Sequence, residues 1–189
     1  NLNLRLDSVT FHNKIGSQAH RVKQIRKITA RAAKLLSADM KVCDQAAILC
    51  KTDLTTHVVS EFPELQGVMG RIYCKIESKK ESIYKAVSDH YKPVTQNDAV
   101  PEEMVSIVIA IADRVFTLTS FWAIKEKPSG SKDPFALRRG AIGLIRILLE
   151  NQLDIKLTDL VEKDVSDEII QDLCQFIADR VFTLTSFWA

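Results

Sequence analysis

Apolar residues recur along this chain at the three- and four-residue spacing of an α-helix, and no alternating run persists long enough to indicate a sheet. Only six glycines and five prolines interrupt the pattern. The sequence therefore predicts an all-α fold, a compact helical bundle. The short start from Leu2 to Leu6 alternates apolar and polar residues and is expected to be extended.

Caps, prolines and apolar spacing divide the chain into predicted helices. The predicted ranges are 11–36 with an interruption near Gly16, 38–62 capped by Ser37 or Asp39, a helix beginning at Pro63, 80–91, 101–123, 134–150 capped by Asp133, and a last helix from about Ser166. Loops are expected at 92–100 and 127–132. The helix at 101–123 is apolar around nearly its whole circumference, so we expect it at the centre of the bundle.

Charge is distributed unevenly, although the net charge is only +2. Residues 1–38 hold eight Lys or Arg against one acid, and residues 39–189 hold eighteen against twenty-three. On the first predicted helix, Lys23, Lys27, Arg31 and Lys34 lie opposite the apolar face and have no acid at helical spacing. This basic stripe fits either a solvated surface or a face that contacts nucleic-acid phosphates.

A second basic group lies around a predicted helix start. Ser131, Lys132, Arg138 and Arg139 surround a helix N-terminus, where free N–H groups and the helix dipole attract anions. Asp133 already supplies a negative cap there. The two arginines therefore bind an anion such as a phosphate or pair with protein groups, and the sequence leaves both open.

Asp113 is the only acid between Glu103 and Glu126, on the most apolar predicted helix. A buried carboxylate must be paired or hydrogen-bonded. We therefore expect Asp113 to form a salt bridge or to bind a helix N-terminus, in preference to a catalytic role.

The cysteines, the first residue and the apolar runs bear on the class of protein. Cys43, Cys50, Cys74 and Cys174 form no CxxC pair, and the spacing favours four reduced thiols in a cytosolic protein. No apolar run is judged long enough to span a bilayer. The first residue is Asn, not Met, which suggests an excised piece of a longer protein.

Three segments resemble a known family. They are KTDLTTHVVSEFPELQGVMGR at 51–71, DHYKP at 89–93, and ADRVFTLTSFWAI followed by PSGSKDPFALRRGAIGLIRI within 112–147. Together they resemble the middle of the β subunit of bacterial two-subunit glycyl-tRNA synthetases. The opening FHNKIGSQAHRVKQI is also similar, and the resemblance covers about residues 4–180.

This resemblance implies an α2β2 ligase that attaches glycine to tRNA. It implies that the α subunit binds glycine, ATP and Mg²⁺, and that the β subunit recognises tRNA(Gly) and supports assembly. The chain alone is then expected to be non-catalytic, to bind no cofactor and no metal, and to be cytoplasmic with no membrane partner. On this basis Lys23, Lys27, Arg31, Lys34, Lys132, Arg138 and Arg139 are the candidate tRNA-binding residues.

The resemblance also implies an HD-domain-like fold over residues 1–180. An HD metal site needs a His-Asp pair, a further His and a distal Asp. The matching positions here are Thr52, Asp53 and Asp113, so the paired His is absent. Phe116 replaces a further acid of the family, and His20, His57 and His90 do not match the motif. A metal-dependent HD-type phosphohydrolase and a helical protein-interaction module stay as alternative functions.

The thirteen residues IADRVFTLTSFWA occur twice, at 111–123 and at 177–189. The segment 181–189 is therefore treated as a duplicated segment whose origin the sequence leaves open. Beyond the family-like region its aromatic residues Phe182, Phe187 and Trp188 are expected to form an exposed apolar patch.

Overall fold

The computed structural model describes the backbone of residues 2–161 and 165–185 and the side chains of residues 5–161 and 165–181. The regular structure in these ranges is helical apart from one pair of short strands, which confirms the all-α prediction. The α-helices are α1 (Gln18–Leu35), α2 (Met40–Leu49), α3 (His57–Glu61), α4 (Val68–Ile76), α5 (Glu81–Asp89), α6 (Met104–Ala123), α7 (Leu137–Glu150), α8 (Leu157–Leu160) and α9 (Asp167–Thr185). The 3-10 helices are η1 (Leu2–Ser8), η2 (Thr52–Thr55) and η3 (Pro63–Leu65), and the strands are β1 (Thr10–His12) and β2 (Gly16–Ser17).

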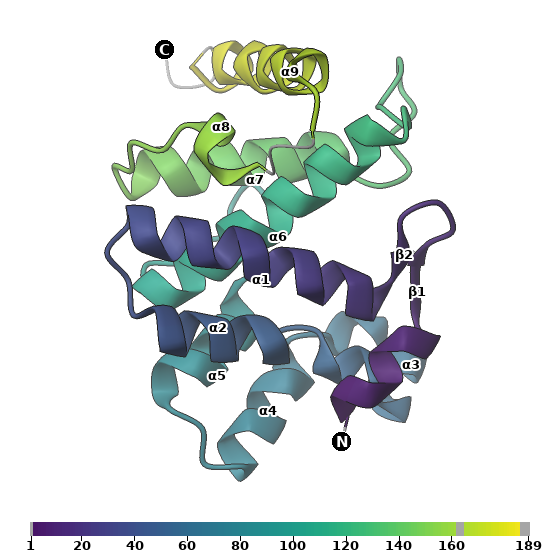
Figure 1. Cartoon of the computed structure of the whole chain (residues 1–189), viewed down its shortest axis with the longest axis vertical. Helices are drawn as coiled ribbons and strands as arrows, with labels where there is room; N and C mark the ends of the chain where they lie inside the picture. Colours follow the sequence, from purple (N-terminus) through teal and green to yellow (C-terminus); the bar gives the residue numbers. More distant parts are fainter. Residues whose placement is uncertain (1, 162–164, 186–189) are drawn as a thin grey trace.

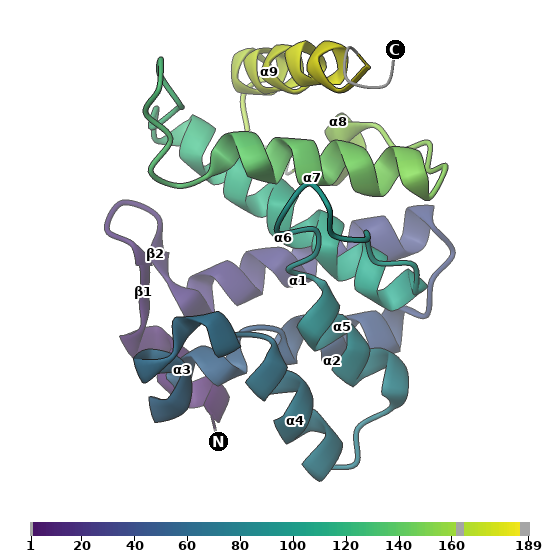
Figure 2. The same ribbon diagram turned by 180° about the vertical axis from the view of Figure 1, so that it is seen from behind.

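Helix α6 lies at the centre of the bundle, as predicted. It packs against α1, α2 and α5 on one side and against α7, α8 and α9 on the other. Figure 1 shows α9 at one end of the molecule and α4 at the other, and Figure 2 shows the same arrangement from behind. Because neighbours surround α6, most of its side chains are buried, and most of these are apolar.

Helix α6 is also the one helix in the described ranges that is long and apolar enough to cross a membrane. The expectation that no apolar run has this length was therefore wrong. Most of the helix is buried inside the bundle, and the core helix of a globular protein passes the same test of length and composition.

The N-terminal segment differs from its prediction. Residues Leu2–Ser8 form η1 in place of an extended segment, and Leu6 is buried. The predicted helix at 11–36 begins only at Gln18, after an antiparallel pair in which Thr10 faces Ser17. Gly16 has a φ of 117°, which favours glycine, and the Ser17 hydroxyl accepts from the His20 N–H at 3.2 Å as the cap.

The predicted helix at 38–62 is interrupted. The Asp39 carboxylate caps α2 by accepting from the N–H groups of Lys41 and Val42, as expected. After Leu49, however, the hydroxyls of Thr52, Thr55 and Thr56 each donate to the carbonyl three residues earlier. Such local bonds compete with the helical pattern, so η2 and α3 replace the end of the predicted helix.

The predicted helix at Pro63 is split into η3 and α4 by Gly67, which has a φ of 79° and precedes α4. Gly70 lets α4 approach α5 closely, because an added Cβ would lie 2.6 Å from Val87 Cγ1. Helix α5 ends at Asp89, two residues before the predicted end. Leu35, the last residue of α1, is 48% exposed.

In the C-terminal third, the helix predicted from Pro134 begins at Leu137. Ala136, not Asp133, is the N-cap residue, although the Asp133 carboxylate accepts from the N–H groups of Leu137 at 2.8 Å and Arg138 at 3.0 Å. Helix α8 was not predicted. Helix α9 is tied to α6 by the Trp122 indole, which donates to Asp172 Oδ2 at 2.6 Å.

Candidate functional site

Asp113 lies on α6 and is only 7% exposed, and two cations bind its carboxylate from different elements. Arg21 on α1 donates to Oδ1 through Nε at 3.1 Å and Nη2 at 2.8 Å. Lys51, between α2 and η2, donates to Oδ2 at 3.0 Å. Burial alone would raise the pKa of Asp113, but Arg21 and Lys51 outweigh it and hold that pKa well below its usual range. The expected salt bridge of Asp113 is confirmed.

Lys51 is fully buried, which is rare for a lysine. Burial lowers the pKa of Lys51 to about 8, against the attraction of Asp113. The amine is therefore protonated at pH 7 and acts as a cation within the protein. It also lies over the Tyr91 ring, 3.9 Å from the ring centroid. Sequence reasoning missed Lys51, because nothing in the sequence around it marks it as buried.

His90 is the third member of this cluster and is fully buried. Its Nδ1 lies 3.0 Å from the Val87 carbonyl and 3.2 Å from the Ala86 carbonyl, so Nδ1 carries the proton. The unprotonated Nε2 lies 2.7 Å from Lys51 Nζ and accepts its hydrogen bond. Burial, and next the charge of Lys51, lower the pKa of His90 well below its usual value.

The other two histidines considered from the sequence lie elsewhere. His20 packs against Phe116, and His57 is exposed beside Glu61 on α3. Of these three histidines, His90 is the one linked to Asp113, because Lys51 is hydrogen-bonded to both side chains.

The remaining HD-like positions do not join Asp113 in a metal site. Asp53 is fully buried, and its Oδ2 accepts from the N–H groups of Gly67 at 2.6 Å and Gly70 at 3.1 Å. Burial raises the pKa of Asp53. Thr52 donates its hydroxyl to the Leu49 carbonyl. Among the described residues, no group of three or more His, Cys, Asp or Glu side chains is placed to hold a metal ion.

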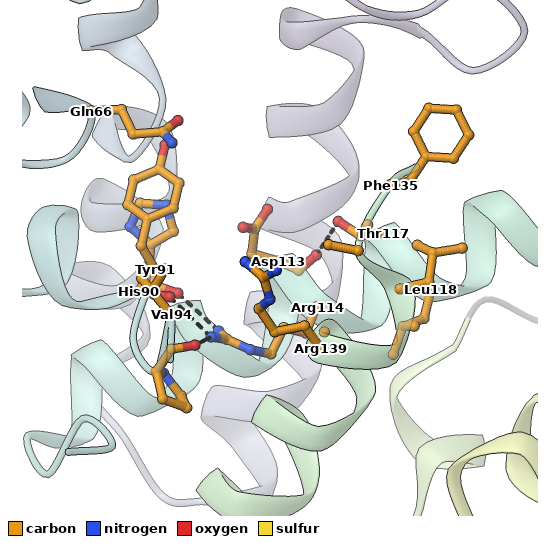
Figure 3. Close-up of a pocket in the computed structure, with 14 residues that line it drawn as sticks. Gln66, His90, Tyr91, Val94, Asp113, Arg114, Thr117, Leu118, Phe135 and Arg139 are labelled. Atoms are coloured by element: carbon orange, nitrogen blue, oxygen red, sulfur yellow. Dashed lines mark hydrogen bonds between the residues drawn. The ribbon is translucent and has the colours of Figure 1, made fainter. Parts of the chain in front are cut away.

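A cleft of about 220 Å³ lies beside the cluster, with Asp113, His90 and Tyr91 in its wall. Figure 3 shows the rings of His90 and Tyr91 on one side and the Asp113 carboxylate on the other. Arg114 closes the base, where its guanidinium donates to the carbonyls of His90, Tyr91, Lys92 and Pro93. Arg139, on α7, lies in the opposite wall.

A second cleft of about 360 Å³ shares Arg139 with the first and runs between the start of α7 and the loop after α5. Arg138 and Arg146 also line it. We call the two clefts, with these three arginines, the arginine groove. Arg138 donates to the Gly130 carbonyl, and Arg146 pairs with Glu150 and donates to the Asp98 carbonyl. Within the described residues, no hydrogen bond or ion pair is found for the exposed Arg139 guanidinium.

Comparison with known proteins identifies the family of this chain. A family model described as "Glycyl-tRNA synthetase beta subunit" matches residues 1–186. The chain belongs to this family. The match runs past Arg180, where the resemblance had been taken to end.

Individual relatives in the glycyl-tRNA synthetase β-subunit family carry the name glycine–tRNA ligase β subunit. The chain is 44% identical over 176 residues to that of Ruegeria sp. (strain TM1040) and 48% identical over 176 residues to that of Paracoccus denitrificans. It is 49% identical over 168 residues to that of Dinoroseobacter shibae. These matches cover 93%, 93% and 89% of this chain, but only 26%, 26% and 23% of the relatives. The chain spans about a quarter of their length.

In this member of the family, the candidate tRNA-binding residues fall into two separate sets. Arg138 and Arg139 lie together in the arginine groove, and Lys132 is exposed in the turn before α7. The sequence analysis missed Arg146, although it is seven residues after Arg139 and so lies on the same face of one helix.

The second set lies on α1. Lys23, Lys27 and Lys34 are exposed, whereas Arg31 is half-buried and donates to the Leu160 carbonyl at 2.9 Å. Helix α1 lies at the front in Figure 1 and α7 at the front in Figure 2. The basic stripe and the arginine groove thus belong to helices on opposite sides of the molecule.

Proposed function

We propose that this chain is part of the β subunit of a glycine–tRNA ligase, where it contacts tRNA phosphates and serves as an assembly scaffold. Membership of the family carries the proposal, and the arginine groove supports its nucleic-acid component. The proposed partners are the α subunit of the ligase and tRNA(Gly), and the proposed compartment is the cytoplasm.

The arginine groove has the chemistry of a phosphate-binding surface. Arg139 presents an exposed guanidinium, and Arg138 and Arg146 are held beside it by bonds to backbone carbonyls. Planar guanidinium groups bind phosphate oxygens in pairs, and positions fixed in advance reduce the entropy lost on binding. The first turn of α7 contributes less, because Asp133 already accepts from two of its N–H groups.

The chain alone is proposed to lack ligase chemistry, with ATP, Mg²⁺ and glycine bound by the α subunit. Asp113 is paired with Arg21 and Lys51, which hold its pKa well below the usual range and make it a poor base. Glycine attachment to tRNA by the purified chain, measured with radiolabelled glycine, should be indistinguishable from a blank. Charging above that level refutes this division of roles.

The HD-type phosphohydrolase is disfavoured by the same geometry. Lys51 places an ammonium group between Asp113 and His90, the two side chains best suited to hold a divalent metal.

The other alternative function, a helical protein-interaction module, is compatible with the scaffold role. Its supporting observation is the apolar face of α4, where Val68, Ile72 and Ile76 are 49%, 42% and 74% exposed.

The groove is tested by tRNA(Gly) binding over a series of salt concentrations. Reversing Lys132 and Arg139 to Glu should weaken binding at low salt. It should also reduce the slope of log K against log salt by roughly 0.7 to 0.9 for each lost phosphate contact. The matched control reverses Lys79 and Lys80, two exposed lysines between α4 and α5, and changes the net charge equally. A folded groove variant that binds like this control contradicts the assignment.

The basic stripe is tested separately. Lys23, Lys27 and Lys34 are changed to Glu together, and Arg31 is retained because it bonds the Leu160 carbonyl and supports packing. If α1 and α7 contact one tRNA, the stripe variant and the groove variant should each lower the salt slope. A variant that combines both sets of changes should lower the slope by the sum of the two reductions. A normal slope for the stripe variant restricts phosphate contact to the arginine groove.

A further inference from the structure

The Lys51 ammonium is held by a complete set of cation ligands. A carboxylate oxygen of Asp113 lies at 3.0 Å, the unprotonated Nε2 of His90 at 2.7 Å, and the face of Tyr91 at 3.9 Å to the ring centroid. No part of the lysine side chain is exposed. We call Asp113, His90 and Tyr91 the cation cage.

The imidazole of the cation cage is oriented as a ligand. Its Nδ1–H is bonded to the backbone carbonyls of Ala86 and Val87, which fixes the tautomer and directs the Nε2 lone pair at the cation. Histidines that bind metal ions are held in this way, with the far ring N–H on a carbonyl or carboxylate. The orientation is set by α5, so it does not depend on Lys51.

The carboxylate is also oriented from outside the cage. Arg21 binds Asp113 Oδ1 through two nitrogens, which turns Oδ2 toward the lysine. A second acid, Asp53, is fully buried nearby, and its Oδ1 has no hydrogen-bond partner among the described residues. Burial raises the pKa of Asp53, against the bonds from the Gly67 and Gly70 N–H groups and the charge of Lys51.

Lys51 supplies one of the two cations that bind the Asp113 carboxylate. Arg21 binds Oδ1 and Lys51 binds Oδ2, while the neutral His90 accepts from Lys51 through Nε2. Removal of the Lys51 side chain leaves the buried Oδ2 of Asp113 and Nε2 of His90 without their donor. Buried polar atoms without a partner are unfavourable, so an emptied cage should attract a replacement cation.

We propose that Asp113, His90 and Tyr91 form a cation-binding site that the chain fills with its own Lys51, and that a small external cation enters it once this side chain is shortened. The resident lysine excludes free ions from the site in the native protein. The ligand class is a primary ammonium ion or, through the carboxylate and imidazole, a divalent metal ion such as Ni²⁺. The proposal is independent of tRNA binding.

The test uses the full chain with Lys51→Ala, which removes three methylene groups and the ammonium. Propylammonium has the same atoms as the deleted part, and 1-propanol is its uncharged match. Propylammonium at a hundredfold excess over its Kd should raise the Tm of Lys51→Ala by roughly 5 to 10 °C. Propanol should raise it far less, and neither compound should move the Tm of the parent chain.

A requirement for His90 distinguishes binding in the cation cage from unspecific binding of a cation. Ni²⁺ should also stabilise Lys51→Ala, and adding His90→Gln should abolish the nickel response. If propanol stabilises Lys51→Ala as well as propylammonium does, the site is an apolar cavity and the proposal fails. It also fails if neither cation stabilises the variant, or if nickel stabilises it equally without His90.

If Lys51→Ala does not fold unaided, the compounds are added while it refolds from urea, and the helical circular dichroism signal is followed. Recovery with propylammonium and not with propanol supports the cation cage. Equal recovery with both, or recovery with neither cation, overturns it.

Discussion

The sequence Ile-Ala-Asp-Arg-Val occurs in both α6 and α9, and the two copies lie in different surroundings. In α6 all five residues are buried. In α9 Ala178 and Asp179 are exposed and the other three are half-buried. Asp113 binds Arg21 and Lys51, whereas Asp179 accepts from Gln175 on its own helix. Identical residues therefore acquire different roles from their neighbours alone.

The arginines of the two copies differ in the same way. Arg114 donates to backbone carbonyls across the loop that follows α5, far from it in sequence. Arg180 stays within α9, where it bonds the Phe176 carbonyl and lies 3.3 Å from the centroid of the Phe176 ring. The polar groups of the first copy bind distant elements, whereas the Arg180 bonds described here lie within its own helix.

The largest expected effect is at the two aspartates. Asp113→Asn leaves the buried Lys51 and the half-buried Arg21 without their shared counter-charge and should lower the free energy of unfolding by about 3 to 5 kcal/mol. Asp179→Asn, the same change on α9, should alter it by less than about 0.5 kcal/mol. Urea denaturation of both variants measures the contrast, and equal losses would show that burial does not distinguish the copies.

The arginines should show the next largest contrast. Arg114→Ala leaves several backbone carbonyls at the base of the cleft without a donor and should cost about 2 to 4 kcal/mol. Arg180→Ala removes one bond within a helix and a ring contact, and should cost about 1 kcal/mol or less. The same denaturation experiment compares them. A loss for Arg180→Ala as large as that for Arg114→Ala contradicts the interpretation.

The pH dependence of stability isolates Lys51, which only the first copy contacts. Burial lowers its pKa to about 8 in the folded protein, below the ordinary lysine value of 10.5. The unfolded chain therefore binds more protons between these pH values, and the contribution of Lys51 to stability rises with pH across this window. The free energy of unfolding of the parent should rise relative to that of Lys51→Met by up to about 1.4 kcal/mol per pH unit. A difference that stays flat from pH 8 to 10.5 rejects the lowered pKa.

That measurement must be a difference between variants, because other groups titrate in the same range. Burial raises the pKa of Cys43 to about 11 and of Cys50 to about 12. These thiols stay protonated in the folded state and ionise earlier in the unfolded chain, so they lower stability as pH rises. The effect of Cys43 is common to both proteins and cancels in the comparison. Lys51 lowers the pKa of Cys50 against the effect of burial, so both proteins carry Cys50→Ala in this experiment.

The smallest contrast is at the alanines. Ala112 is fully buried in α6, and a leucine there would overpack the core and cost about 1 to 3 kcal/mol. Ala178 is exposed in α9, and the same change should stay within about 0.5 kcal/mol. Thermal unfolding of the two variants tests the pair, and a similar drop in Tm for both would place Ala178 in a packed interface.

The sequence predicted the features that depend on local chemistry. The apolar circumference of α6 indicated its central place, and the predicted cap at Asp39 is present. Asp113 was expected to be paired because an isolated acid on an apolar helix has few other options. Its partners Arg21 and Lys51 come from distant parts of the chain, and no periodicity connects them.

The features that were missed depend on competition or on tertiary contact. Threonine hydroxyls interrupt the helix after Leu49, and Gly16 permits the hairpin before α1. Lys51 looks like an ordinary surface lysine in the sequence. The HD likeness, the division at residue 180, the tRNA-binding residues and the cofactors stay predictions, and the apolar patch expected at Phe182, Phe187 and Trp188 lies outside the described side chains.

Because Trp122 is hydrogen-bonded to Asp172 on α9, the intrinsic tryptophan fluorescence of the protein should report whether α9 is docked on α6. The chain has two tryptophans, and Trp122 is 2% exposed, with its indole N–H bonded to a carboxylate on α9. Separation of α9 from α6 breaks that bond and admits water to the ring, which shifts indole emission to longer wavelength. With Trp188 replaced by phenylalanine, the emission maximum reports the docking of one helix in solution, without any attached dye.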